Sequence, residues 1–258
     1  HYLGIDEPRL VTFAQELART GVIVLTPELA SLTDYRVQAS SVEEIRASVV
    51  HLSASPWVRD GRVGVMGASF AGGLALRAAT DPTLQSRLAF VFSMGGHTDL
   101  GRVTRFLTTD ELVTPTGVVH LRAHDYGLVV FVYAYAERFV DAGSLYNFKD
   151  ALRLFLQQNR RESERVGAYL QGDARWLYER VLAHDKTALR ARVEAVLPSV
   201  RGVMSEGSPG GHLAVVRCPV YLLHGADDDV IPATESRFAA LELEAHTRVH
   251  LLVTTAVD

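Results

Sequence analysis

The sequence has little of several features that mark particular classes of protein. A single cysteine, Cys218, excludes an internal disulfide framework and a metal site built from several cysteines. The longest strongly apolar stretch, 127–136, is much shorter than the about 20 residues that a membrane-spanning helix needs. The 26 basic side chains do not exceed the 30 acidic ones, and the formal net charge of −4 argues against a nucleic-acid-binding surface. We therefore expect no membrane span and no nucleic-acid partner.

The composition is that of a folded globular protein. Of the 258 residues, 48% are hydrophobic and 22% are charged, and this length allows one large domain or a core with an insertion. The chain opens on His1 rather than Met and closes directly after a strand-like run, so we expect further residues on both sides. We favour a cytoplasmic location, and the sequence leaves the oligomeric state open.

Helices and strands alternate over the first hundred residues. Apolar periodicity predicts helices at 8–20, 42–52 and 72–79, and strands at 22–25, 62–66 and 88–93. Ser41 is the expected N-cap of the second helix. This order predicts a mostly parallel sheet with helices on both faces.

The alternation stops after residue 100. Helical periodicity alone follows, and the expected helices lie at 118–140, 145–159, 173–183 and 187–197. Strand signals resume at 220–223 and 248–254. We therefore expect an α/β core made of 1–100 and 216–258, with a helical insertion at 101–215.

A run of small residues surrounds Ser69, between a predicted strand and a predicted helix. A serine at the apex of so tight a turn holds a strained backbone, which needs small neighbours, and Gly67, Ala71 and Gly72 supply them. This geometry exposes the Ser69 hydroxyl and aims the backbone N–H of Phe70 at the place where an oxyanion would form.

Other interpretations of this turn fit its residues less well or explain less. A phosphate-binding loop is excluded, because Gly73 and Leu74 stand where lysine and serine or threonine are required. A dinucleotide-binding fingerprint is weak, because Ser69 replaces the second glycine and no acidic residue ends the next strand. A glycine-rich turn with an ordinary serine remains the plain alternative.

A second signal follows the strand at 220–223. Asp227, Asp228 and Asp229 form an acidic loop that Pro232 closes, at the carboxyl edge where parallel sheets place functional side chains. A solvated turn is the plain alternative. A calcium site is disfavoured because the glycine and the distant glutamate of the EF-hand pattern are absent.

Together these two segments resemble the α/β-hydrolase superfamily of serine esterases and lipases. Residues 67–72 resemble its nucleophile elbow, and residues 224–232 resemble its acid loop. The resemblance implies a catalytic triad with Ser69 as nucleophile and, four residues before Pro232, Asp228 as acid. It implies that the insertion is a lid and that no cofactor is needed.

The same resemblance implies an oxyanion hole formed by the backbone N–H of Phe70 and a second N–H from Tyr2, or alternatively from Leu3. Ala71 departs from the family pattern by replacing the second glycine of the elbow, and adds a methyl where the helix approaches closely.

The expected catalytic histidine is not evident. The family order places it on the loop after the final strand, here 248–254, and no histidine follows His250. His246 precedes that strand, and neither it nor His250 is expected to reach the carboxyl edge. We therefore predict that the base lies just beyond Asp258.

Lesser candidates were also considered. His120 and His124 lie four apart on a predicted helix, but without a third ligand a metal site is not expected. Asp99, near His97, is the reserve acid. Core packing is the default explanation of the aromatic residues in the insertion, although a lid over an acyl pocket would also bury them. They are Tyr126, Phe131, Tyr133, Tyr135 and Phe139.

The sequence thus predicts a serine hydrolase that cleaves a small-molecule carboxylic ester through an acyl-enzyme intermediate. The alternative is a non-catalytic relative of the same fold that binds a ligand or acts as a scaffold.

Overall fold

The structure is a computed structural model that describes residues 3–256, and it divides into two compact units. The first comprises the residues up to Val103, Thr114–Gly117 and the residues from Val203 onward. The second comprises Thr104–Val113 and Val118–Gly202.

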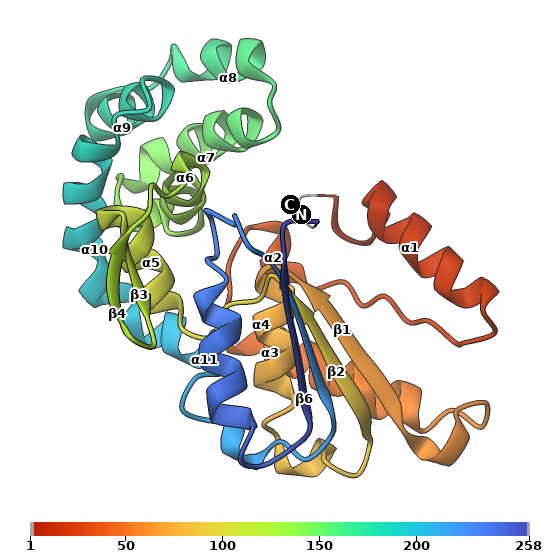
Figure 1. The fold of residues 1–258 in the computed structure, drawn as a ribbon. Coiled ribbons are helices and arrows are strands. Elements are labelled where there is room, and N and C mark those ends of the chain that lie inside the picture. Colours follow the sequence, from red (N-terminus) through yellow and green to blue (C-terminus); the bar gives the residue numbers. More distant parts are fainter. Residues whose placement is uncertain (1–2, 257–258) are drawn as a thin grey trace. The chain divides into compact units, whose positions relative to one another are not determined.

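A four-stranded parallel sheet forms the centre of the first unit (Figure 1). Its strands, in the order β1-β2-β5-β6, are β1 (Val63–Ala68), β2 (Leu88–Met94), β5 (Val220–Gly225) and β6 (Val249–Thr254). Met94 pairs with Ala68 of β1 and with Leu223 of β5, so the carboxyl ends of these strands meet at one edge. The parallel α/β sheet predicted from the sequence is confirmed.

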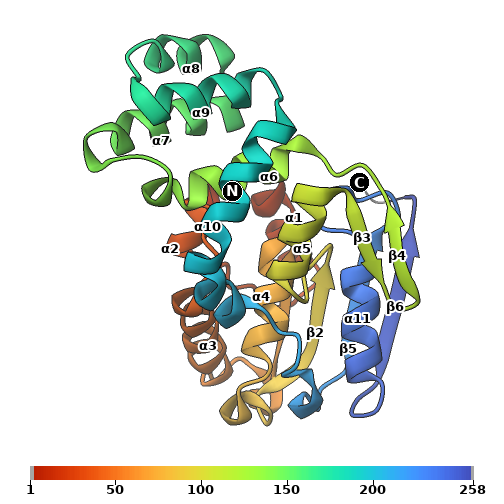
Figure 2. The same cartoon turned by 90° about the vertical axis from the view of Figure 1, so that its left-hand side faces the viewer.

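Three helices pack on one face of this sheet: α3 (Ala39–Ser53), α4 (Phe70–Ala78) and α11 (Thr234–Leu243). Figure 2 shows α3 beside α4, with α11 next to β5 and β6. The buried core between helices and sheet includes Leu76 of α4, Val91 of β2, Leu222 of β5 and Leu243 of α11. Burial of this apolar surface is the main force that holds the sheet and helices together.

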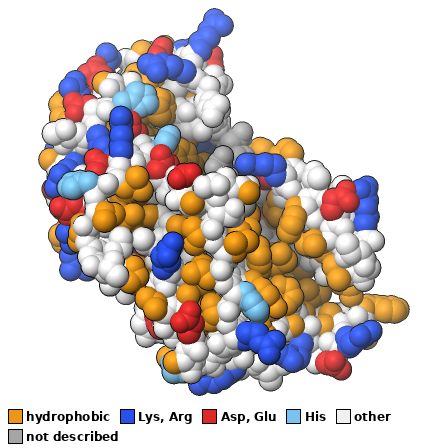
Figure 3. Space-filling view, in the orientation of Figure 1, with side chains coloured by type: hydrophobic (Ala, Val, Ile, Leu, Met, Phe, Trp, Pro, Cys, Tyr) orange, Lys and Arg blue, Asp and Glu red, His pale blue; other side chains and the backbone are white. Residues whose placement is uncertain are grey.

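The other face of the sheet is uncovered in the described residues. Met66, Tyr221 and Leu252 are 41%, 39% and 58% exposed. Hydrophobic side chains gather over the strands on this face (Figure 3). The helix α1 (Pro8–Arg19) has no buried residue, whereas α3, α4 and α11 all contribute buried residues.

Two local predictions for this unit were wrong. Residues 22–25 form no strand, and Val22 and Ile23 are 52% and 49% exposed, because no neighbouring strand pairs with them. Ser41 lies inside α3 rather than capping it; the helix starts after Gln38, and the Ser41 hydroxyl contacts that of Ser31. The remaining short elements are η1 (Gly4–Asp6), α2 (Ala30–Thr33), η2 (Arg59–Gly61), η3 (Pro82–Leu84) and η5 (Leu213–Val215).

The second unit is mainly helical, as the periodicity predicts. Its elements are α6 (Asp125–Ala134), η4 (Ala136–Arg138), α7 (Ala142–Leu156), α8 (Arg160–Gly167) and α9 (Gly172–Leu182), together with β3 (Glu111–Thr114) and β4 (Gly117–His120) except for Thr114 and Gly117, which belong to the first unit. Two helices, α5 (Leu100–Thr109) and α10 (Lys186–Gly207), contribute residues to both units.

The prediction of a single helix at 118–140 was wrong. Its first part pairs with β3 as strand β4, since Val118 and Val119 are β-branched and follow a turn at Gly117. The helix α6 starts only after His124, whose ring nitrogen Nδ1 accepts a hydrogen bond from the backbone N–H of Tyr126. No helix in the described part of the chain combines the length and apolarity that a membrane crossing requires.

Candidate active site

Ser69 occupies the turn between β1 and α4 in a conformation that non-glycine residues rarely adopt. Its φ is 55° and its ψ is −132°. Two backbone hydrogen bonds hold the turn: Ser69 N–H donates to Met94 O at 2.7 Å, and Gly72 N–H donates to Ser69 O at 2.9 Å. The side chain is exposed, and within residues 3–256 its hydroxyl forms no hydrogen bond. Strain of this kind, held by the surrounding structure, is characteristic of functional sites.

Small residues make this turn possible. A Cβ on Gly67 would lie 2.3 Å from the carbonyl oxygen of Ala71, and one on Gly72 would lie 2.6 Å from Ser93 Oγ. Both distances are shorter than any real contact of a Cβ atom, so neither position accepts a side chain. Ala71 contributes its backbone to the close approach while its methyl is partly exposed, which explains why alanine fits there.

The first helical residue after the serine is Phe70. The N–H groups of the first turn have no partner within a helix, and the helix dipole makes them suitable for a developing negative charge. The backbone N–H of Phe70 thus has the position expected of an oxyanion donor. Tyr2, the second expected donor, lies outside the described residues, and Leu3, the alternative, precedes the short helix η1.

Asp228 lies in the loop after β5, and its two carboxylate oxygens have different surroundings. Oδ1 accepts hydrogen bonds from Val230 N–H at 3.0 Å and Ile231 N–H at 2.9 Å. Oδ2 has no hydrogen bond from the described residues and lies 3.5 Å from the point where a Cβ on Gly95 would sit. Oδ1 therefore holds the loop, while Oδ2, which lies 3.6 Å from Nε2 of His224, keeps the capacity to accept a hydrogen bond.

Ser69 and Asp228 are brought to the same sheet edge by the turn after β2. Met94, the last residue of β2, accepts the hydrogen bond of Ser69, and the next residue, Gly95, lies beside Asp228. Gly95 has a φ of +59° and donates to Leu223 O at 2.8 Å. A side chain on Gly95 would be strained and would intrude beside the carboxylate.

The neighbouring aspartates have other surroundings. Asp227 is exposed and Asp229 is half-buried, and neither side chain forms a hydrogen bond with another described residue. The reserve acid, Asp99, accepts a hydrogen bond from Arg102 N–H at 3.0 Å and so caps the start of α5. Asp228 is thus the member of the acidic loop that lies beside Gly95.

His224 holds the acid loop in place through two hydrogen bonds. The side chain is completely buried, and its Nε2 lies 2.7 Å from the carbonyl oxygen of Ile231, to which it donates. Its Nδ1 lies 2.7 Å from the hydroxyl of Ser236 and accepts from it. Because both ring nitrogens are hydrogen-bonded, His224 fixes the loop and is not a base, a role that the sequence did not predict.

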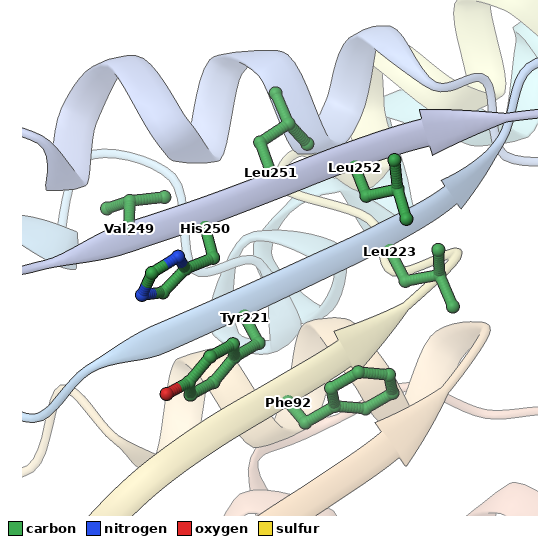
Figure 4. Close-up of a pocket in the computed structure, with 7 residues that line it drawn as sticks. All are labelled: Phe92, Tyr221, Leu223, Val249, His250, Leu251 and Leu252. Atoms are coloured by element: carbon green, nitrogen blue, oxygen red, sulfur yellow. The ribbon is translucent and has the colours of Figure 1, made fainter.

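The remaining histidines near the sheet are not placed as bases. His97 is completely buried, and burial lowers its pKa to about 4; its Nε2 donates to Gly207 O at 3.1 Å. His250 stacks on Tyr221, with ring centroids 4.8 Å apart and planes inclined by 7° (Figure 4). It lines an apolar pocket of about 490 Å³ on the uncovered face, well before the end of β6 at Thr254.

The candidates in the second unit are not brought together as a metal site. His120 ends β4 and His124 caps α6, so the two do not share a helix face. No cluster of three or more potential metal ligands occurs within residues 3–256. Phe131 packs against Tyr135 and Phe139, with ring centroids 5.0 and 6.3 Å apart, which is the packing of a hydrophobic core.

Solved structures with a similar arrangement come from several bacteria. A lipase/esterase from Lactobacillus plantarum is 13% identical with a TM-score of 0.43, and the match covers 99% of this chain and 77% of that one. The rice cell wall degrading esterase LipA from Xanthomonas oryzae is 12% identical with a TM-score of 0.40, and the match covers 90% and 60%. The chain is similar to α/β-hydrolases.

A third similar α/β-hydrolase is MGS-M2 from a Medee basin deep-sea metagenome library, 12% identical with a TM-score of 0.37 over 86% of this chain and 66% of that one. The chain thus spans 60% of the length of LipA and 66% of that of MGS-M2. No protein-family model matches the chain, and no curated protein matches it.

Proposed function

We propose that this protein is a serine hydrolase that cleaves a carboxylic ester through an acyl-enzyme intermediate. The observation that supports this most strongly is the strained Ser69, exposed at the start of α4 and on the same sheet edge as Asp228, whose Oδ2 accepts no hydrogen bond from the described residues. A plain structural turn would not need a serine that combines a φ of 55° with a ψ of −132° and an exposed hydroxyl.

In the proposed reaction Ser69 Oγ attacks the acyl carbon while a histidine accepts its proton. The backbone N–H of Phe70 stabilises the tetrahedral oxyanion, a contribution of about 3 kcal/mol per donor in comparable sites. The C–O bond then breaks, the histidine returns the proton to the leaving alcohol, and a water releases the acid by the same steps in reverse.

Asp228 would orient this histidine. Its Oδ1 is already used by two backbone N–H groups, so Oδ2 is the oxygen that would accept the Nδ1–H of the imidazole. The base itself is proposed to follow β6, at a position after 258, as the chain order of the resemblance implies. No cofactor takes part.

The second oxyanion donor and the insertion complete the proposal. Tyr2, or alternatively Leu3, would provide the second N–H, and residues 101–215 would form a lid that sets the preference for substrate. Amides, lactones and thioesters would suit the same chemistry. The alternative remains a binding or scaffold protein that lacks the base.

Labelling with a fluorophosphonate probe tests the proposal in the full-length protein. We expect the wild type to be labelled and to hydrolyse a short p-nitrophenyl ester, and Ser69→Ala to lose both activities while its circular dichroism spectrum is unchanged. Ser199→Ala, at an exposed helical serine, is the control and should behave as the wild type. A wild type that is neither labelled nor active would favour the binding or scaffold protein.

A further inference from the structure

Glu235 is a completely buried carboxylate at the start of α11, and four donors surround it. Its Oε2 accepts hydrogen bonds from the backbone N–H groups of Thr98 and Asp99, both at 2.8 Å. Arg102 donates from Nε to Oε1 at 2.5 Å and from its terminal nitrogen to Oε2 at 3.0 Å. A buried charge with such partners is compensated, but it is not needed for packing, since apolar residues often replace buried ion pairs without loss of stability.

The contacts of Glu235 connect two segments that carry the proposed chemistry. The backbone N–H of Glu235 donates to Pro232 O at 2.9 Å, at the end of the loop that carries Asp228. Glu235 also binds the turn after β2, and the hydroxyl of Thr98 donates to Glu235 O at 2.6 Å. The same turn begins at Met94 O, which accepts the N–H of Ser69.

Hydrogen bonds thus hold the turn after β2 at both of its ends, next to the loop that carries Asp228. At the strand end, Gly95 N–H donates to Leu223 O at 2.8 Å, and at the helix end Glu235 binds Thr98 and Asp99. Asp228 lies between these two points, beside Gly95. The position of the Asp228 carboxylate relative to Ser69 therefore depends on both sets of hydrogen bonds.

We propose that Glu235 is a positioning residue that sets Asp228 relative to Ser69 through the turn after β2; this inference rests on the proposed serine hydrolase. The carboxylate is specifically required because it presents acceptors only. A glutamine would have to turn its NH₂ group either toward the donors of Arg102 or toward the two backbone N–H groups. Either orientation sets donor against donor and displaces the turn.

The test compares Glu235→Gln with Glu242→Gln in the full-length protein. Glu242 is a matched control, because it lies on the same helix and also accepts two backbone hydrogen bonds, from Gly211 at 2.9 Å and Leu213 at 2.6 Å, yet it does not touch the turn after β2. Stopped assays with a p-nitrophenyl ester would give kcat and KM, and titration with the fluorophosphonate would give the concentration of active sites.

For Glu235→Gln we expect kcat per active site to fall about ten- to hundred-fold with KM nearly unchanged, the effect of a small displacement of catalytic groups. The acidic limb of the kcat/KM profile should move to lower pH, because a displaced Asp228 stabilises the protonated base less. Glu242→Gln should change neither quantity, whatever its effect on melting temperature. A loss of stability alone would not move the acidic limb.

Each outcome decides the inference. If Glu235→Gln folds and keeps the wild-type kcat and pH profile, Glu235 is only a structural ion pair and the inference is wrong. If Glu235→Gln does not fold, Arg102→Lys decides, because it keeps the charge but loses the two-pronged contact and should show the same two changes to a smaller extent. If the wild type itself is neither labelled nor active, the proposed function has failed, and this inference fails with it.

Discussion

The backbone N–H of Ser69, in the turn after β1, donates to the carbonyl oxygen of Met94, the last residue of β2, at 2.7 Å. This bond continues the pairing of the two strands by one residue beyond Ala68. The strained serine is therefore held by the sheet as well as by its own helix, and Asp228 reaches the same edge through Gly95, the residue after Met94.

Asp228→Asn should lower ester hydrolysis far more than the same change at its neighbours. Loss of the charge that orients the base costs about 10⁴-fold in kcat in a serine hydrolase triad. Asp227→Asn and Asp229→Asn should stay within a few-fold of the wild type, because neither side chain bonds to the described residues. Equal losses in all three, or a larger loss in Asp99→Asn, would show that the acid has been assigned to the wrong residue.

Gly67→Ala should destabilise the protein and lower its activity together. The added methyl would meet the carbonyl oxygen of Ala71, and overpacking of this kind costs about 1–3 kcal/mol. Gly202→Ala is the control, because a Cβ there meets nothing within 4 Å, and it should leave the free energy of unfolding unchanged or raise it. Urea unfolding of both variants checks this; equal midpoints would contradict the close approach at Gly67.

Acidification from pH 6.5 towards pH 4 should destabilise the protein through His97. In the unfolded chain this imidazole takes up a proton as the pH falls below 6.5, whereas burial holds its folded pKa at about 4. Since the unfolded state binds more protons in this window, stability is complete above pH 6.5 and falls by about 3 kcal/mol by pH 4.

The variant His97→Gln checks this contribution. Urea unfolding at several pH values should give a lower overall stability but a flatter dependence between pH 6.5 and 4 than in the wild type. His51→Gln, at an exposed helical position, should keep the wild-type slope. Parallel curves for wild type and His97→Gln would assign the acid sensitivity to other groups.

Aromatic substitutions in the second unit should separate core packing from substrate preference. Phe131→Ala should lower the free energy of unfolding by about 3–5 kcal/mol, and with it the melting temperature, because Phe131 is buried. Tyr133→Ala should also lower both, because Tyr133 is 3% exposed. Tyr126, at 36%, is the remaining candidate for contact with an acyl group. Tyr126→Ala should change the ratio of kcat/KM between short and long esters with little change in melting temperature; the opposite pattern would reverse these roles.

The sequence predicted the parallel sheet and the Ser69 turn because their signals are local. Alternating apolar runs define β1, β2 and β5, and the turn depends on small residues within a few positions of Ser69. The bonds of Glu235 were not predictable, because its partners Thr98 and Arg102 lie 137 and 133 positions away in the chain. A glutamate in the first turn of a helix is ordinarily exposed, and nothing local marks this one as buried.

The wrong predictions also arise from contacts that are distant in the chain. The Val22–Leu25 run has the composition of a buried strand, but a strand exists only where another strand pairs with it, and none does among the described residues. The helical periodicity around Val118 was outweighed by pairing with β3. The structure does not test the expected catalytic histidine or the expected second oxyanion donor, because Tyr2 lies outside the described residues and the histidine was predicted after residue 258.

The unequal surroundings of the two Asp228 oxygens decide what an amide would do at this position. Val230 N–H and Ile231 N–H both point at Oδ1, so in Asp228→Asn the loop would select the rotamer whose carbonyl oxygen accepts them. The NH₂ group would then face the place proposed for the imidazole and would donate where the carboxylate accepts. The imidazole would have to turn an unprotonated nitrogen toward that amide and carry its hydrogen on the nitrogen that faces Ser69. The variant would therefore hold the base in the tautomer that cannot accept the serine proton.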